Sequence, residues 1–192
     1  MKQSNENKLI EIIYETVEKF IGDWRNSPYE WETEIDIQCE IANRLRQLIK
    51  SWGLLILKAS YDYIRNGRQQ EYSRVCCEPG TNYNDSNRDG SRNDCKPDIV
   101  VYDDIDDPDN PPDLTPERNW PMLWACEIKY QTEDNCVSQN WDIEKMKYLL
   151  KQDETKYACC LYFNRKGINM NPIKPAEDEN HKFRSYTVLP EK

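Results

Sequence analysis

Histidine is almost absent from this 192-residue chain, and the one histidine, His181, lies in a charged segment near the C-terminal end. Catalysis by a histidine general base needs an imidazole held against the reacting groups. The residues around His181 give no sign of such a site. Any chemistry must therefore depend on carboxylates, lysine or a metal ion.

The eight cysteines lack the pairing that structural zinc sites use, since none lies in a C-x-x-C pair and zinc ligands normally come in closely spaced Cys/His pairs. Long hydrophobic runs are also missing, because none approaches the ~20 residues needed to span a bilayer. The polar N-terminal residues do not look like a secretory signal. We therefore expect a cytoplasmic protein with reduced thiols and no membrane partner.

Hydrophobic residues make up only 38% of the chain, below the ~45–50% of typical globular proteins. Six Trp, twelve Tyr and three Phe compensate, because each buried aromatic side chain removes ~150–250 Å² from water. The length suits one domain. We expect a single domain over 1–192 with a modest core and long polar loops.

Apolar periodicity predicts an N-terminal helix over 7–22 and a stronger one from about Thr33 to Trp52, with Gly53 as its stop. The acidic segment 103–121 holds five prolines and is expected to be an insertion. The remaining pattern predicts strands over 54–57, 72–77, 98–102, 122–130, 157–163 and 186–189, and a helix over 141–151. These elements indicate an α/β fold with a central mixed β-sheet flanked by helices.

Charged side chains interrupt the best strand of the chain, residues 122–130. Because side chains alternate between the two faces of a strand, Glu127 and Lys129 share one face about 7 Å apart. Asp98 opens a neighbouring apolar strand directly after Pro97, a position where strands tolerate proline. If the two strands pair, Asp98 and Glu127 converge on one site.

Two carboxylates and a lysine suit phosphodiester hydrolysis. Mg²⁺ is typically held by one or two carboxylates together with waters and substrate phosphate. The ion polarises the phosphoryl oxygen and lowers the pKa of a bound water. A lysine ammonium can orient that water or stabilise developing negative charge.

Lys96-Pro97-Asp98 followed by Glu127-Ile128-Lys129 resembles the signature of the PD-(D/E)xK nuclease superfamily, and Glu34 begins an upstream helix where family members often carry another glutamate. A helix and a buried strand follow the E-x-K strand, as in the family. The resemblance covers about residues 30–165. It implies a restriction-endonuclease-like domain.

The same resemblance implies a Mg²⁺-dependent endonuclease, with Mn²⁺ as a substitute, acting on DNA rather than RNA. Asp98, Glu127 and Glu34 would be the metal ligands. Lys129 would be catalytic, and Glu34 would complete the catalytic set. Many family members are dimers, so a homodimer is an open expectation.

Net charge opposes a nucleic-acid partner, because the chain carries −9 and nucleic-acid binders usually present a basic stripe. Residues 41–78 are locally basic, with seven Arg or Lys against three acids, and so could contact phosphates despite the negative total. From them we take Arg44, Arg65, Arg68 and Arg74 as candidate phosphate contacts. The same stretch also fits an ordinary solvated helix face and loop.

Two other functions stay open: a non-catalytic member of the same fold that serves as a binding or regulatory module, and an interaction protein whose acidic loop 103–117 binds a basic partner. The site residues also have ordinary interpretations. These are an exposed Glu127–Lys129 ion pair, Asp98 at the end of a turn, Glu34 as a first-turn acid, Asp142 as an N-cap and Lys145 as a surface charge.

Overall fold

The structure is a computed structural model that describes residues 2–54, 56–60, 69–78, 97–104, 121–131, 139–172 and 174–192. Its helices are α1 (Lys2–Asn26), α2 (Glu34–Ser51) and α3 (Gln139–Lys151). Its strands are β1 (Ile56–Ser60), β2 (Gln69–Ser73), β3 (Val75–Cys77), β4 (Ile99–Tyr102), β5 (Met122–Gln131), β6 (Thr155–Asn164), β7 (Ala176–Glu177) and β8 (Phe183–Val188). The expected insertion 103–121 falls mostly outside these ranges.

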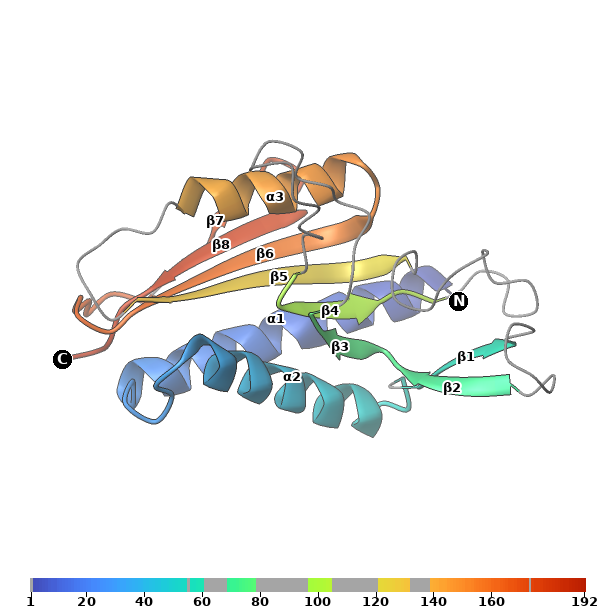
Figure 1. Cartoon of the computed structure of the whole chain (residues 1–192), viewed down its shortest axis with the longest axis horizontal. Helices are drawn as coiled ribbons and strands as arrows, with labels where there is room; N and C mark the ends of the chain where they lie inside the picture. Colours follow the sequence, from blue (N-terminus) through green and yellow to red (C-terminus); the bar gives the residue numbers. More distant parts are fainter. Residues whose placement is uncertain are drawn as a thin grey trace, which may run out of the picture.

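A six-stranded mixed sheet in the order β3-β4-β5-β6-β8-β7 forms the centre of the domain. Strands β3, β4 and β5 are antiparallel, whereas β5, β6 and β8 run parallel. Parallel neighbours need a crossover connection, and α3 supplies it between β5 and β6. Helices α1 and α2 cover one face of the sheet and α3 covers the other (Figure 1). The expected α/β fold with a flanked mixed sheet is confirmed, and β1 and β2 form a separate antiparallel pair.

The larger core lies between the sheet and the α1–α2 layer. Phe20 and Trp24 of α1 pack against Phe163 of β6, with ring centroids 5.7 and 5.1 Å apart. Tyr186 of β8 is buried in the same cluster. The core is therefore wider than the expected 30–165, because α1 supplies a whole layer and β8 is an interior strand of the sheet.

Helix α2 begins where the sequence predicts, and its first turn is fixed by a capping box. The side chain of Thr33 accepts a hydrogen bond from the backbone N–H of Asp36, and the Asp36 carboxylate accepts one from the Thr33 N–H. Glu34 is thus the first residue of a well-anchored helix. Gly53 follows the helix with a φ of +71°, a conformation that favours glycine.

Helix α3 covers a second, smaller core on the opposite face of the sheet. Its Met146 and Leu149 are buried with Ala125 of β5 and Cys160 of β6. None of the helices in the described ranges is long and apolar enough to span a membrane.

Candidate active site

Strand β5 continues past the end of its neighbour β4, which begins only at Ile99. The backbone N–H groups of Ile128 and Tyr130 on that edge need other acceptors. Ile128 N donates to Asp98 Oδ2 at 2.5 Å, and Tyr130 N donates to Glu34 Oε2 at 3.3 Å. Two carboxylates from distant segments therefore take the place of a neighbouring strand and are fixed beside β5.

Lys129 lies between two of the predicted carboxylates. Its Nζ is 3.1 Å from Glu127 Oε1 and 3.2 Å from Glu34 Oε1. Burial lowers the pKa of Lys129, but attraction from Glu127, Asp98 and Glu34 outweighs burial and raises the pKa above its ordinary value. Lys129 is accordingly a cation at neutral pH. The four residues proposed from the sequence do come together, so the interpretation of Glu127 and Lys129 as an exposed pair is wrong.

Helix α3 adds two charged residues that the sequence interpretation treated as peripheral. Asp142 and Lys145 are each only 5% exposed, and Lys145 Nζ lies 2.6 Å from Glu127 Oε2. Asp142 lies inside the helix, three residues after its start, so it is not an N-cap. Lys145 is not a surface charge. The signal for Asp142 was present in the helical period, since it recurs with the buried Met146 and Leu149 at i, i+4 and i+7.

Two carboxylates of this cluster, Asp98 and Asp142, have pKa values above the ordinary value for aspartate. Burial and the neighbouring negative charge of Glu127 raise the pKa of Asp98 to about 7, despite the hydrogen bond from the backbone of Ile128. Burial and Glu127 also raise the pKa of Asp142. With Glu34, four carboxylates face the ammonium groups of Lys129 and Lys145. When all are ionised the cluster is short of positive charge.

The donor set fits a magnesium ion held by two carboxylates better than one held by three. Among the described residues, no three His, Cys, Asp or Glu side chains form a ready-made ion site. Glu34 accepts from the ammonium of Lys129 and also from the backbone N–H of Tyr130. Glu127 contacts only lysine ammonium groups, those of Lys129 and Lys145, and an incoming cation would compete with them. Asp98 and Glu127 are also the pair whose negative charges repel, and Mg²⁺ commonly uses one or two carboxylates with waters completing the shell. Their mutual repulsion would be relieved by a cation between them.

Two of the four predicted phosphate contacts, Arg44 and Arg74, are engaged elsewhere in the fold. Arg74 is buried at 3% exposure and donates to Leu54 O, Tyr102 O and Asp104 Oδ1 at 2.8, 2.9 and 2.5 Å. Its assignment as a nucleic-acid contact is therefore corrected: all of its donor groups serve the fold. Arg44 pairs with Asp23 and Glu40, and Arg65 and Arg68 lie outside the described residues.

Replacing Arg74 with methionine is expected to lower the free energy of unfolding by about 2–4 kcal/mol, because buried acceptors lose their donor. Arg44→Met is the matched control, since its ion pairs are partly exposed and such pairs contribute about 0–1 kcal/mol. Urea unfolding monitored by tryptophan fluorescence measures both. If Arg74→Met is as stable as the wild type but binds nucleic acid more weakly, Arg74 is a phosphate contact after all and the structural role assigned to it is wrong.

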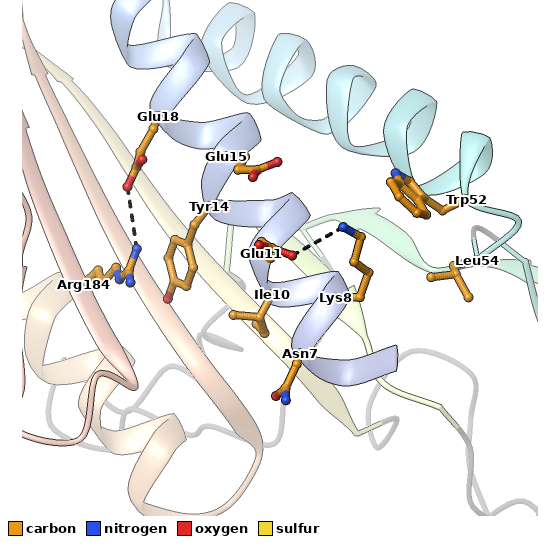
Figure 2. A pocket seen from close by; sticks show the side chains of 10 residues that line it. All are labelled: Asn7, Lys8, Ile10, Glu11, Tyr14, Glu15, Glu18, Trp52, Leu54 and Arg184. Atoms are coloured by element: carbon orange, nitrogen blue, oxygen red, sulfur yellow. Dashed lines mark hydrogen bonds and ion pairs between the residues drawn. The ribbon is translucent and has the colours of Figure 1, made fainter. Parts of the chain in front are cut away.

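A hollow of about 810 Å³ lies beside α1 (Figure 2), away from the carboxylate cluster. Trp52, which follows the end of α2, forms part of its wall, whereas Glu34 begins that helix. A helix of 18 residues separates its ends by roughly 25 Å. Three glutamates line the hollow, namely Glu11, Glu15 and Glu18, so it is poorly suited to a phosphate.

The carboxylate cluster combines a cation-seeking pair, Asp98 and Glu127, with a charged lysine, Lys129, at one edge of the sheet. Such a set can hold a divalent ion and stabilise negative charge developing on a bound phosphate. Comparison of the chain with protein-family models, with curated proteins and with solved structures found no match.

Proposed function

We propose that this protein is a metal-dependent nuclease that hydrolyses phosphodiester bonds, in DNA rather than RNA. The observation that carries the proposal is the convergence of Asp98, Glu127 and Lys129 into one cluster in which carboxylates outnumber ammonium groups. The order of elements supports the restriction-endonuclease-like reading of the fold. A helix bearing Glu34 precedes an antiparallel β3-β4-β5 unit, and α3 then crosses over to the parallel strand β6.

Each residue has a distinct part in the proposed reaction. Asp98 and Glu127 would hold Mg²⁺, which when bound supplies Lewis-acid polarisation of the phosphoryl oxygen and a water of lowered pKa. Lys129, charged and next to Glu127, orients the attacking water and stabilises negative charge on the phosphate. Glu34 fixes the position of Lys129 through its 3.2 Å contact.

Lys145 has a positioning part in the same scheme. Its 2.6 Å contact with Glu127 Oε2 fixes one oxygen of that carboxylate from the α3 side. The other oxygen faces Lys129 at 3.1 Å. Both oxygens of this buried carboxylate are thereby held in a fixed orientation by charged partners.

The test is cleavage of plasmid, linear duplex and single-stranded substrates in Mg²⁺, Mn²⁺ or EDTA. The wild-type protein should cleave at least one substrate with either metal and none in EDTA, and Asp98→Asn/Glu127→Gln should be inactive. Glu40→Gln is the matched control: like Glu34 it is a glutamate of α2, but its partner is Arg44. We expect Glu40→Gln to cleave as the wild type does.

Activity in EDTA, or undiminished activity of the double variant, would contradict the proposal. Absence of cleavage on every substrate, with nucleic-acid binding retained, would favour the alternative of a non-catalytic binding module.

A further inference from the structure

A second hollow has a volume of about 1020 Å³. Three segments far apart in the sequence form its walls: residues 26–30 between α1 and α2, residues 165–168 after β6, and residues 190–191 after β8. The α1–α2 turn, the end of β6 and the C-terminus lie at one end of the molecule (Figure 1). The hollow therefore occupies that end of the sheet.

Buried Arg25 ties these walls together. Its guanidinium donates to Asn169 O at 2.7 Å and pairs with Glu191 at 3.1 Å. Backbone bonds from Glu191 N to Arg25 O and from Asn169 N to Pro190 O, both 3.0 Å, complete the frame. The hollow is thus preformed, and a ligand would bind without first ordering its walls.

The chemistry of the walls combines an exposed aromatic ring with cations. The Tyr29 side chain is 71% exposed, and the Arg165 guanidinium lies over its ring at 5.0 Å from the centroid. Ile168, 58% exposed, and Lys166 also line the hollow. Of the two acids there, Glu191 is already paired with Arg25. A tyrosine–arginine pair of this kind offers a flat surface for a base and positive charge for a phosphate.

The hollow adjoins the residues proposed to cleave. Arg165 N donates to the carbonyl oxygen of Gln131 at 3.3 Å, and Gln131 is two residues beyond Lys129 on β5. Two strand residues span about 7 Å. On the opposite wall, Glu30 lies four residues before Glu34, the first residue of α2. A strand of nucleic acid lying in the hollow would therefore lead towards Lys129.

Unpaired nucleotides fit these features better than a duplex does. Bases within a duplex are stacked on one another and cannot reach an exposed tyrosine. Duplex binding also depends on many phosphate contacts, which a chain of net charge −9 is poorly equipped to make. Stacking supplies affinity that does not depend on charge. Resting on the nuclease function proposed above, we propose that this hollow binds unpaired nucleotides of the substrate beside the scissile phosphate.

Fluorescence anisotropy tests this with a labelled oligothymidylate of about 15 nucleotides, an oligouridylate and a duplex, all of equal length, in Ca²⁺ buffer. The wild type should bind a single strand more tightly than the duplex, and the two single strands show whether DNA or RNA is preferred. Tyr29→Ala should weaken single-strand binding about ten-fold. Tyr29→Phe, which keeps the ring, should bind as the wild type does.

The matched control is Tyr148→Ala, which removes a tyrosine exposed at 41% on α3 and should leave binding unchanged. Arg165→Met should also weaken binding and reduce its dependence on salt. Tighter binding of duplex, no measurable single-strand binding, or Tyr29→Ala binding like the wild type would overturn the inference.

The cleavage assay separates the two proposals. Tyr29-dependent binding without cleavage under any metal condition would contradict the nuclease function and leave the binding site in place. Metal-dependent cleavage of single strands that Tyr29→Ala performs at the wild-type rate and KM would contradict the binding site alone.

Discussion

Replacing Lys129 with methionine is expected to lower kcat for phosphodiester cleavage by about 10²–10³-fold, with a much smaller change in KM. Removing one preorganised group that stabilises transition-state charge typically has an effect of this size. The ammonium of Lys129 is held 3.1 Å from Glu127 and 3.2 Å from Glu34, so its position is fixed before substrate binds. Methionine keeps the length of the side chain and removes only the charge and the donors.

Two other lysines serve as comparisons. Lys156 also pairs with two carboxylates, Glu6 and Asp103 at 2.6 and 2.8 Å. It is the second residue of β6, whereas Glu127 pairs with Cys160 further along that strand, so Lys156→Met should cleave normally. Lys145→Met removes the other cation that contacts Glu127 and makes the cluster more negative, so it should lower the Mg²⁺ concentration needed for half-maximal rate, while the loss of a fixed Glu127 lowers the rate at saturation. Single-turnover cleavage across a Mg²⁺ titration measures all three. Equal rates for Lys129→Met and Lys156→Met would rule out a catalytic part for Lys129.

The part of the site that could be predicted from the sequence is the placement of Glu127 and Lys129 on one face of β5, which follows from the alternation of side chains along a strand. Alternation along β5 places Glu127 and Lys129 on the face of Ala125, and the structure has them there, towards α3 and Glu34. Alternation fails near the start of the strand: an unbroken period of two would place Leu123 on that same face, but Leu123 is in the cluster with Trp124. The β4–β5 register shifts between Val101 and Tyr102, and such an irregularity leaves no sign in the apolar pattern.

Helix α3 and Arg74 show what the sequence could not predict. The burial of Arg74 depends on Leu54, Tyr102 and Asp104 meeting around it, and no local pattern encodes that meeting. Lys145 is ambiguous in a different way, because a lysine next to buried Met146 is normally solvated. Only the position of Glu127 on the facing strand makes its burial favourable, since a buried charge needs a partner.

The extent of the sheet was underestimated for a related reason. The expected strand 186–189 is β8, but it begins at Phe183 and pairs with β6 over six residues. Arg184 lies within it and interrupts the apolar pattern. Its guanidinium covers the ring of Tyr14 at 3.9 Å, so a charged side chain contributes to packing there. Single charged residues in a strand are thus weak evidence that the strand has ended.

Replacing Asp98 with asparagine is expected to stabilise the metal-free protein at pH 8 by about 1–3 kcal/mol. Burial first, and then Glu127, raise the pKa of Asp98 from 3.8 to about 7, so the folded state binds this proton more tightly than the unfolded state does. The wild type therefore loses stability as pH rises between these two values, and above pH 7 it retains the full penalty. Asparagine removes the charge and can still accept the hydrogen bond from Ile128 N.

Magnesium should reverse the order of the two proteins. A ligand that binds only the folded state raises the free energy of unfolding, and Asp98 is one of the two carboxylates proposed to hold the ion. Urea unfolding at pH 5 and pH 8, in EDTA and in excess Mg²⁺, measures both effects. Glu40→Gln is the control, with no crossover expected. If Asp98→Asn is the less stable protein in EDTA at pH 8, the pKa of Asp98 is not raised in the folded protein. If Mg²⁺ stabilises Asp98→Asn as much as the wild type, Asp98 is not a ligand, because a carboxylate that holds the ion cannot be neutralised without weakening its binding.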